Sequence, residues 1–271
     1  MDGGARASFS GTGSGGAAGS HPLSDLFRRG VKAESIAEPL ASYDFDQPAE
    51  AVRALLEARD FDVAGVRVNG SVGGIVRREE LVGGSCFDHL RELDPALVVP
   101  AHAPLAEVIV RLGASPFVLV SAFGAVAGIV TRADLQKPPA RMWLFGLLML
   151  IEDLLGRALR RRFPDDSWKG LLSAARLERA LALQAERRRR KESLALVDCL
   201  SFGDKWWVLG KDDDFRRIAG WESRTLARER GKELEELRNR LAHAQDVTTA
   251  SLPTIVRMAD RLEELLAIAR L

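Results

Sequence analysis

Thr131 and Asp134 are separated by two residues, at a point where a helix is expected to begin. A threonine hydroxyl at a helix N-terminus can donate to a phosphate, which the free backbone N–H groups there also attract. A carboxylate accepts hydrogen bonds through two oxygens and suits a pair of neighbouring hydroxyls. The same Thr-x-x-Asp spacing can also form a capping box that only satisfies the helix end. The pair could therefore hold a ligand or do no more than cap a helix.

Arg238, Asn239 and His243 form a second polar group, on a segment with helical periodicity. An imidazole can act as a general acid or base, and a guanidinium can hold a phosphate. Five residues turn an α-helix through about 140°, so Arg238 and His243 do not lie one above the other. They would converge only if the helix loosens near Ala242 or if a second copy of the helix contributes. The simpler interpretation is a favourable histidine at a helix C-terminus and a surface pair between Arg238 and Glu235.

A duplication fixes the architecture of the first half. Residues 70–81 return as residues 124–135, with seven of twelve positions identical at a constant offset of 54. A repeat of this kind predicts two similar structural units that pack together. Each unit is expected to have a helix opened by a proline, two strands joined by a tight turn, and a second helix. The expected elements are a helix after Pro48, strands 63–68 and 72–76 and a helix from 77, then a helix after Pro104, strands 117–120 and 126–130 and a helix from 131.

The chain beyond Pro139 has no alternation of apolar and polar residues, and its periodicity predicts helices only. The fold class is therefore α+β, with two β-α repeat units, followed by an all-α helical bundle. Three regions are expected: a Gly/Ser-rich disordered tail over 1–30, the repeat pair over 31–138 and the helical part over 139–271. Core packing accounts for Trp206 and Trp207 better than base stacking does. The expected helices are 141–162, 167–191, 193–210, 222–245 and 252–271.

Composition narrows the class of protein. Residues 1–138 hold 13 Lys and Arg against 17 Asp and Glu, whereas residues 139–271 hold 26 against 21, so only the second half carries net positive charge. The two cysteines, Cys86 and Cys199, exclude a disulfide framework or a cysteine-based zinc site and favour a cytoplasmic location. The sequence has no cluster of carboxylates or histidines that would suggest a metal site. The apolar run 142–151 is too short to span a bilayer, so no membrane partner is expected.

The repeat units, each ending in Gly-Ile-Val-x-Arg-x-acidic-Leu, resemble tandem CBS domains over roughly residues 34–137. The resemblance implies a cleft between the repeats that binds an adenosine-containing ligand, such as AMP, ADP, ATP or S-adenosylmethionine. It also implies that Thr131 touches the phosphate and that Asp134 holds the ribose hydroxyls. Backbone near residues 114–117 would cradle the base.

The first repeat departs from this pattern, because Arg77 and Glu80 stand at the equivalent positions. Arg77 could reach a phosphate in the other site, or the first site could be degenerate. One adenylate site, built around Thr131 and Asp134, is therefore expected.

The second half resembles HEPN domains in its helix count and in the Arg-x4-His spacing of Arg238 and His243. Asn239 matches the polar residue that often follows the arginine in that family. The resemblance implies a homodimer in which these residues of both chains meet in one cleft and cleave RNA without metal. His243 would be the general acid or base, Arg238 would neutralise the phosphate, and Asn239 would position the histidine or contact RNA. The products would be a 2′,3′-cyclic phosphate and a 5′-hydroxyl.

Together the two halves predict a metal-independent endoribonuclease whose activity is regulated by an adenine nucleotide or S-adenosylmethionine, with no cofactor required for cleavage. The alternative is a non-enzymatic adenylate-sensing scaffold whose helices only dimerise or bind RNA or protein partners.

Overall fold

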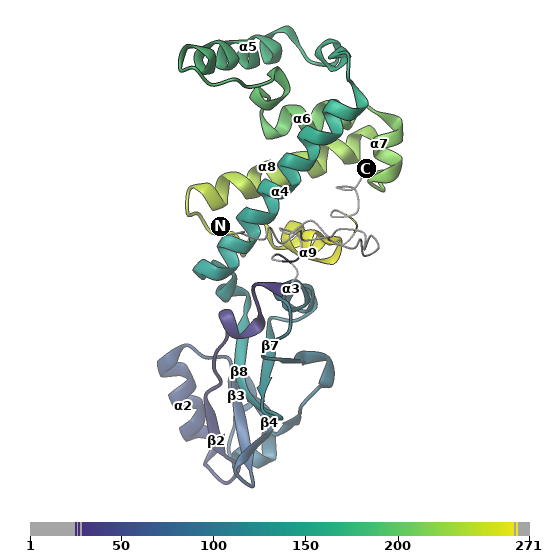
Figure 1. Cartoon of the computed structure of the whole chain (residues 1–271). Coiled ribbons are helices and arrows are strands. Elements are labelled where there is room, and N and C mark those ends of the chain that lie inside the picture. The colour runs from purple at the N-terminus through teal and green to yellow at the C-terminus, as the bar shows by residue number, and fades with distance from the viewer. Residues whose placement is uncertain (1–24, 26, 28, 263, 265–271) are drawn as a thin grey trace, which may run out of the picture.

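Figure 1 shows the computed structural model of the chain, in which residues 25, 27, 29–262 and 264 are described. Two β-sheets with their helices form one end of the molecule, and the long helix α4 (Pro138–Arg162) leads from them into the helical end. Most of the expected tail, residues 1–24, lies outside the described residues. Within the expected tail, the Phe27 carbonyl accepts a hydrogen bond from Trp143 Nε1 at 2.6 Å.

The duplicated segments fold as two matching antiparallel strand pairs. β3 (Val63–Val68) pairs with β4 (Ser71–Arg77), and β7 (Phe117–Ala122) pairs with β8 (Ala125–Thr131), so the bounds repeat at the offset of 54. The register shifts after Val66 in the first pair and at the equivalent place in the second. The duplication therefore extends to a local irregularity of the sheet.

Both predicted hairpin turns are confirmed. Asn69 and Gly70 have φ values of 54° and 81°, and Phe123 and Gly124 have φ values of 50° and 84°. Two successive residues with positive φ match the twist of the flanking strands, and glycine adopts this conformation without steric cost. The Phe123 side chain is fully exposed, so the turn does not depend on packing of its ring.

The edge strands of the two sheets come from two short segments of chain. Each segment supplies one edge strand to one sheet and the next edge strand to the other sheet. The first sheet has the order β2-β3-β4-β5 and the second has the order β1-β8-β7-β6. Only Leu40 and Ala41 separate β1, which pairs with β8, from β2, which pairs with β3. The two repeats are thereby interlocked and pack face to face. The edge strands are β1 (Glu38–Pro39), β2 (Ser42–Asp44), β5 (Arg91–Glu92) and β6 (Val98–Pro100).

The helices α2 (Ala49–Arg59) and α3 (Leu105–Ala114) start directly after their prolines, as predicted. Leu55 of α2 is 44% exposed, whereas Leu56 is fully buried. The helices expected from residues 77 and 131 are only short 3-10 turns. Further 3-10 turns join other elements; the full set is η1 (Ala33–Ser35), η2 (Arg78–Glu80), η3 (Cys86–His89), η4 (Pro95–Leu97), η5 (Arg132–Gln136), η6 (Ser167–Leu171) and η7 (Leu196–Cys199).

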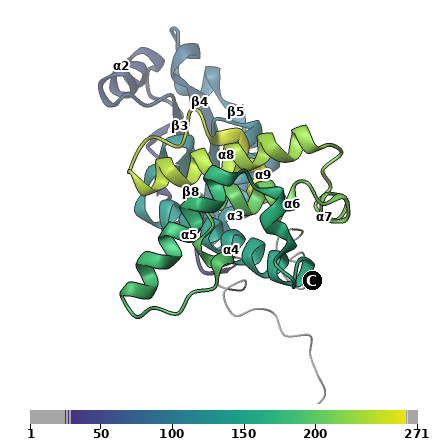
Figure 2. The same ribbon diagram turned by 90° about the horizontal axis from the view of Figure 1, so that it is seen from above.

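The second half is helical, but its helices are more broken than the sequence indicates. Viewed from above, α4, α5, α6 and α8 lie over the strands (Figure 2). Residues 167–191 and 193–210 were each expected to form one helix, yet each contains a 3-10 turn and a shorter α-helix. The helices after α4 are α5 (Ala174–Arg189), α6 (Phe202–Leu209), α7 (Asp213–Ile218), α8 (Arg224–Ala242) and α9 (Leu252–Asp260); the expected helix end at 265–271 lies outside the described residues.

One hydrophobic core runs through both halves. It includes Leu112 of α3, Leu147 of α4 and Ile255 of α9, and α3 packs against α9. A domain boundary near Pro139 remains a prediction, because apolar contacts continue across it. The apolar run of α4 is buried in this core, apart from its exposed Met142 and Met149. In the part of the chain that the structure describes, every helix is too short or too polar to span a bilayer.

The close approach of α6 and α8 depends on Gly231. A Cβ atom added to Gly231 would lie 2.2 Å from Trp206 Cδ1. The indole cannot easily move, because its Nε1 donates to the Ala227 carbonyl at 2.6 Å and its ring packs against Trp221. Core packing of Trp206 is thus confirmed. Trp207 is half-buried, and the same expectation stays a prediction for it.

Replacing Gly231 by alanine should therefore destabilise the protein by about 2 kcal/mol, since overpacking outweighs the roughly 1 kcal/mol helix preference of alanine. Urea unfolding followed by tryptophan fluorescence measures this difference. Gly156→Ala in α4 is the matched control, because its nearest neighbouring atom, on Arg160, lies at 3.8 Å. Equal stability of the two variants would contradict the close-packing argument.

Candidate functional site

A cleft of about 780 Å³ opens between the two repeats. It brings together Thr131 and Asp134 from the second repeat with Arg77 from the first. Phe117, at the end of the expected base cradle, also lines it, as does Pro116. Sequence reasoning left open whether Arg77 serves the other repeat's site, and the structure places it in the same cleft as Thr131.

Thr131 and Asp134 form a capping box at the start of η5. Asp134 Oδ2 accepts hydrogen bonds from the Thr131 backbone N–H at 2.6 Å and from the Thr131 hydroxyl at 2.9 Å. Its Oδ1 receives the Lys137 ammonium at 2.7 Å. The capping interpretation is therefore confirmed. A carboxylate oxygen has two acceptor positions, so Oδ1 retains one for a further donor.

Lys137 holds Asp134 in place from the neighbouring helix start. Its ammonium also contacts Glu38 at 2.8 Å and donates to the Ile36 carbonyl at 2.8 Å. Burial opposes the charge on Lys137, but the hydrogen bonds to Asp134 and Glu38 outweigh it and raise the pKa of the ammonium. The Asp134 carboxylate is thus fixed in orientation toward the cleft floor, with only 7% of the residue exposed.

The equivalent turn of the first repeat is built differently. Glu80, which replaces the aspartate, accepts both ends of the Arg91 guanidinium, with Nε at 2.6 Å. These hydrogen bonds lower the pKa of Glu80. Arg77 Nε is buried without a hydrogen-bond partner, and its closest acidic neighbour, Glu79, is 3.9 Å away. The first repeat therefore contributes an uncommitted cation rather than a second hydroxyl-binding carboxylate.

The charges lining the cleft are mostly paired with each other. Arg78 bonds to Asp60 and Asp62 at 3.3 and 2.6 Å, and Arg132 donates to the Leu112 carbonyl. Five carboxylates and three guanidiniums line the cleft; Arg77 has one long contact with a carboxylate, and Arg132 bonds to a backbone carbonyl. No three His, Cys, Asp or Glu side chains among the described residues are placed to share a metal ion.

Arg238, Asn239 and His243 lie exposed near the C-terminal end of α8. The helix ends at Ala242, and His243 is its C-cap with its N–H bonded to the Asn239 carbonyl at 3.0 Å. Arg238 Nη1 donates weakly to Asn239 Oδ1 at 3.5 Å. Within one chain no hydrogen bond joins Arg238 to His243, and the expected Arg238–Glu235 pair does not form between these described residues.

A hydrogen-bonded junction joins the cleft to the end of α8. Arg141, in the first turn of α4, donates to the carbonyls of Leu241 at 3.1 Å and Gln245 at 2.9 Å. It also donates to Gln136 Oε1 at 2.7 Å, and the Gln136 amide bonds to Asp246. Sequence reasoning missed this junction, because nothing local marks two residues that meet across about a hundred positions of chain.

The loop after α8 is ordered by Asp246. Its carboxylate accepts the Thr248 hydroxyl at 2.7 Å and the Thr248 N–H at 3.0 Å. These hydrogen bonds hold the pKa of Asp246 well below its ordinary value of 3.8. The carboxylate is therefore ionised at neutral pH and available to Gln136.

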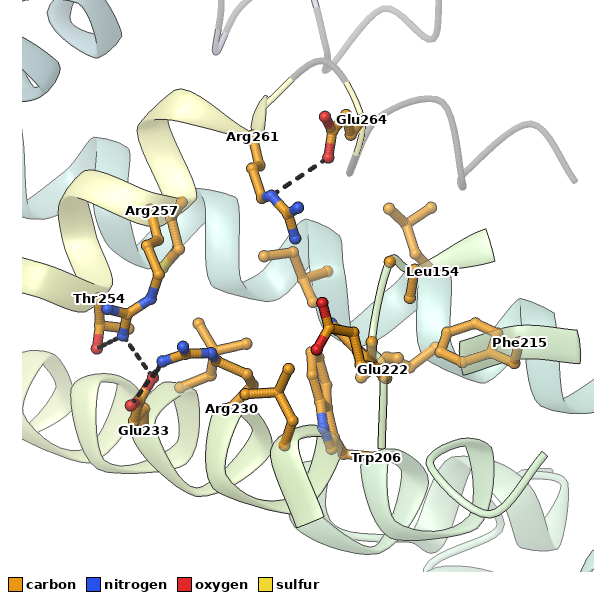
Figure 3. A pocket seen from close by; sticks show the side chains of 18 residues that line it. Leu154, Trp206, Phe215, Glu222, Arg230, Glu233, Thr254, Arg257, Arg261 and Glu264 are labelled. Atoms are coloured by element: carbon orange, nitrogen blue, oxygen red, sulfur yellow. Dashed lines mark hydrogen bonds and ion pairs between the residues drawn. The ribbon is translucent and has the colours of Figure 1, made fainter. Parts of the chain in front are cut away.

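A second cavity, of about 400 Å³, lies between α4, α8 and α9. Its floor is apolar and aromatic, with Trp206 and Leu154 (Figure 3). At its rim Glu233 lies between two guanidiniums, that of Arg230 at 2.9 Å and that of Arg257 at 2.5 Å. None of the candidate site residues Thr131, Asp134, Arg238, Asn239 and His243 lines this cavity. Three carboxylates and three guanidiniums line it, so its formal charge is zero.

No protein-family model and no curated protein matches this chain. Solved structures that resemble it include a CBS domain-containing protein of unknown function from Bacillus anthracis, with 14% identity, a TM-score of 0.37, and coverage of 41% of this chain and 93% of that one. Another is the CBS-pair protein CBSX2 from Arabidopsis thaliana, with 17% identity, a TM-score of 0.35, and coverage of 38% and 90%. CBSX2 has also been solved in complex with AMP, at the same identity and TM-score.

These identities and TM-scores carry no inference about ligand or activity in this chain. The paired-repeat arrangement follows from its own strand order and 54-residue offset, and it is the arrangement that the resemblance to tandem CBS domains implies.

Proposed function

We propose that the protein binds an adenosine-containing ligand in the cleft between its repeats and that this ligand regulates RNA cleavage by the helical half. One observation carries the proposal: the turn that holds Thr131 and Asp134 continues directly into α4, whose Arg141 binds the end of α8 beside His243. A change in the turn therefore has a short covalent and hydrogen-bonded route to the α8 motif. Regulation requires a structural element with two conformations whose equilibrium depends on both sites.

In this proposal Asp134 accepts one ribose hydroxyl through the open position of Oδ1. Thr131 and the backbone of η5 face the phosphate, and Arg77 supplies the positive charge from the opposite repeat. Phe117 and Pro116 contact the base. Because five carboxylates face three guanidiniums in the cleft, repulsion grows with each added phosphate. AMP, or the cationic S-adenosylmethionine, suits this cleft better than ATP.

The proposed chemistry at α8 uses residues of two chains. His243 removes the proton of a ribose 2′-hydroxyl as it attacks the adjacent phosphorus, and a second histidine protonates the leaving 5′-oxygen. Arg238 neutralises the phosphate as charge builds, while Asn239 contacts RNA or orients the histidine. Two copies are needed because Arg238 and His243 do not contact each other within one chain. The exposure of all three residues leaves them available to a partner chain and to RNA.

The second candidate is an adenylate-sensing scaffold without catalysis. The observation that favours it is the ordinary helix end at His243, where the histidine only terminates α8. In that case the cleft and the Arg141 junction would keep their roles, and the α8 surface would bind a partner instead of cutting RNA.

Titration calorimetry tests the ligand site. The wild type should bind AMP or S-adenosylmethionine more tightly than ATP, and Asp134→Asn should weaken binding about tenfold, because an amide replaces a charged acceptor worth roughly 1.5–3 kcal/mol. Glu80→Gln is the matched control, since Glu80 is engaged by Arg91 outside the cleft lining. Unchanged affinity in Asp134→Asn, or no heat from any ligand, would contradict the assignment.

Cleavage of a labelled RNA in the presence of EDTA tests the nuclease. His243→Ala and Arg238→Ala should each lower the rate at least a hundredfold, in line with the loss of a general acid–base or a charge-stabilising group. The controls are His102→Ala and Arg59→Ala, which alter exposed residues of the same types in the repeat half. If the α8 variants cut RNA as fast as the control variants, the nuclease proposal is wrong and the non-catalytic scaffold is the better account.

A further inference from the structure

A positively charged pocket of about 320 Å³ lies between α5, α6 and α8. α5 contributes Arg176 and Arg179 to it, and α8 contributes Arg228 and Lys232. Among the described residues that line it, the only opposing charges are two carboxylates, Asp204 and Glu235. The lining therefore carries a formal charge of +2, in contrast to the net negative cleft between the repeats.

Most of these cations are not held by a carboxylate. Arg179 donates only to the Ala175 carbonyl of its own helix at 3.3 Å. Lys232 approaches Glu236 at 3.7 Å while both side chains are more than half exposed, and such a pair contributes little. Arg228 is exposed and makes no hydrogen bond or ion pair within the described part of the chain. Three cations from two helices thus face the same pocket and remain free to bind an anion.

Asp204 is committed to the structure of the pocket. It accepts the Arg176 guanidinium at 2.9 Å and the Ser201 hydroxyl at 2.7 Å. Arg176 is thereby fixed over the indole of Trp207, with 5.3 Å between the guanidinium carbon and the ring centroid. The Lys211 ammonium lies 5.0 Å from the same ring. A half-buried indole flanked by cations, next to free guanidiniums, is the combination that single-stranded nucleic acids bind.

The pocket continues along one face of α8. Arg228, Lys232, Glu235, Asn239 and His243 stand at positions i, i+4, i+7, i+11 and i+15, which project from the same side of a helix, so the row holds one carboxylate between its cations and Asn239. At 1.5 Å per residue, the row from Arg228 to His243 is about 22 Å long. A chain bound at the pocket and following this row would pass Asn239 and reach His243.

We propose that this pocket and the α8 row form a track for single-stranded RNA. Arg179, Arg228 and Lys232 bind consecutive phosphates, Trp207 contacts a base, and the strand leads to the end of α8. A single strand fits because its unstacked bases can reach the indole, whereas duplex RNA presents its phosphates and narrow major groove instead. The proposal that the strand reaches His243 for cleavage rests on the proposed nuclease. The proposal that the pocket and the α8 row bind RNA does not depend on it.

Fluorescence anisotropy with a labelled uridine oligomer carrying 2′-O-methyl groups tests the track. Methylation removes the nucleophile, so binding is measured without cleavage. The double variant Arg228→Glu/Lys232→Glu should raise Kd at least tenfold in about 0.1 M salt. It should also reduce the slope of log affinity against log salt concentration by about 1.4, which corresponds to two lost phosphate contacts on a single strand.

The matched control is Arg53→Glu/Arg59→Glu, which reverses the same number of charges on the exposed face of α2. It should leave Kd within about twofold, and unchanged thermal unfolding of both double variants shows that the fold is intact. Equal loss of affinity in both double variants would overturn the track, because net charge alone would then explain binding. Binding of polyglutamate as tight as that of RNA, or no binding of RNA by the wild type, would overturn it too.

Binding and cleavage measured together distinguish failure of the track from failure of the proposed nuclease. If the oligomer binds through Arg228 and Lys232 but unmodified RNA is not cut, the track stands and the nuclease fails. If RNA is cut by His243 with the same KM in the wild type and in Arg228→Glu/Lys232→Glu, the nuclease stands and the track fails.

Discussion

The guanidinium of Arg141 provides the contact on which the relation between the two halves depends. The last carbonyls of an α-helix have no partners within the helix and carry its partial negative charge. Arg141 supplies donors to three of the carbonyls around the end of α8, those of Arg240, Leu241 and Gln245. The same side chain bonds to Gln136, the last residue of η5. The η5 turn, the start of α4 and the end of α8 therefore form one polar cluster.

The rest of the molecule is arranged around this cluster. The interlocked sheets fix the position of η5, because β1 and β8 pair directly beside it and Lys137 bonds to both Glu38 and Asp134. The shared apolar core fixes α4 against α9 and α8. The proposed regulation would use the short hydrogen-bonded path from Asp134 to the end of α8, because a packed core does not deform gradually.

The duplication explains how one fold has two different turns. Identical glycines and apolar residues preserve the strands, the register shift and the turns in both repeats. The polar positions have diverged: Asp134 is held by Lys137, whereas Glu80 is held by Arg91. Because Arg77 then lines the cleft with Thr131, the two repeats contribute complementary parts to one candidate site.

The elements that sequence predicted well are those determined by local rules. The Asn69–Gly70 turn and the apolar runs on either side of it specify β3 and β4, and Pro104 with its four buried apolar positions specifies α3. Residues 167–191 were misjudged because a helical pattern does not reveal where tertiary contacts favour a 3-10 turn, as at Trp168. The Arg141 junction and the pocket around Trp207 were missed for a related reason. They bring together residues from distant segments, and only the folded chain determines those contacts.

Hydrogen–deuterium exchange at the end of α8 tests the linkage between the cleft and the α8 motif most directly. The reporters are the amides of His243 and Gln245, which bond to the carbonyls of Asn239 and Arg240 at 3.0 and 2.9 Å. Saturating AMP should change their exchange in the wild type and should have no effect on them in Arg141→Ala, although both proteins bind AMP. An identical response in the two proteins, or no response in the AMP-saturated wild type, would contradict the linkage.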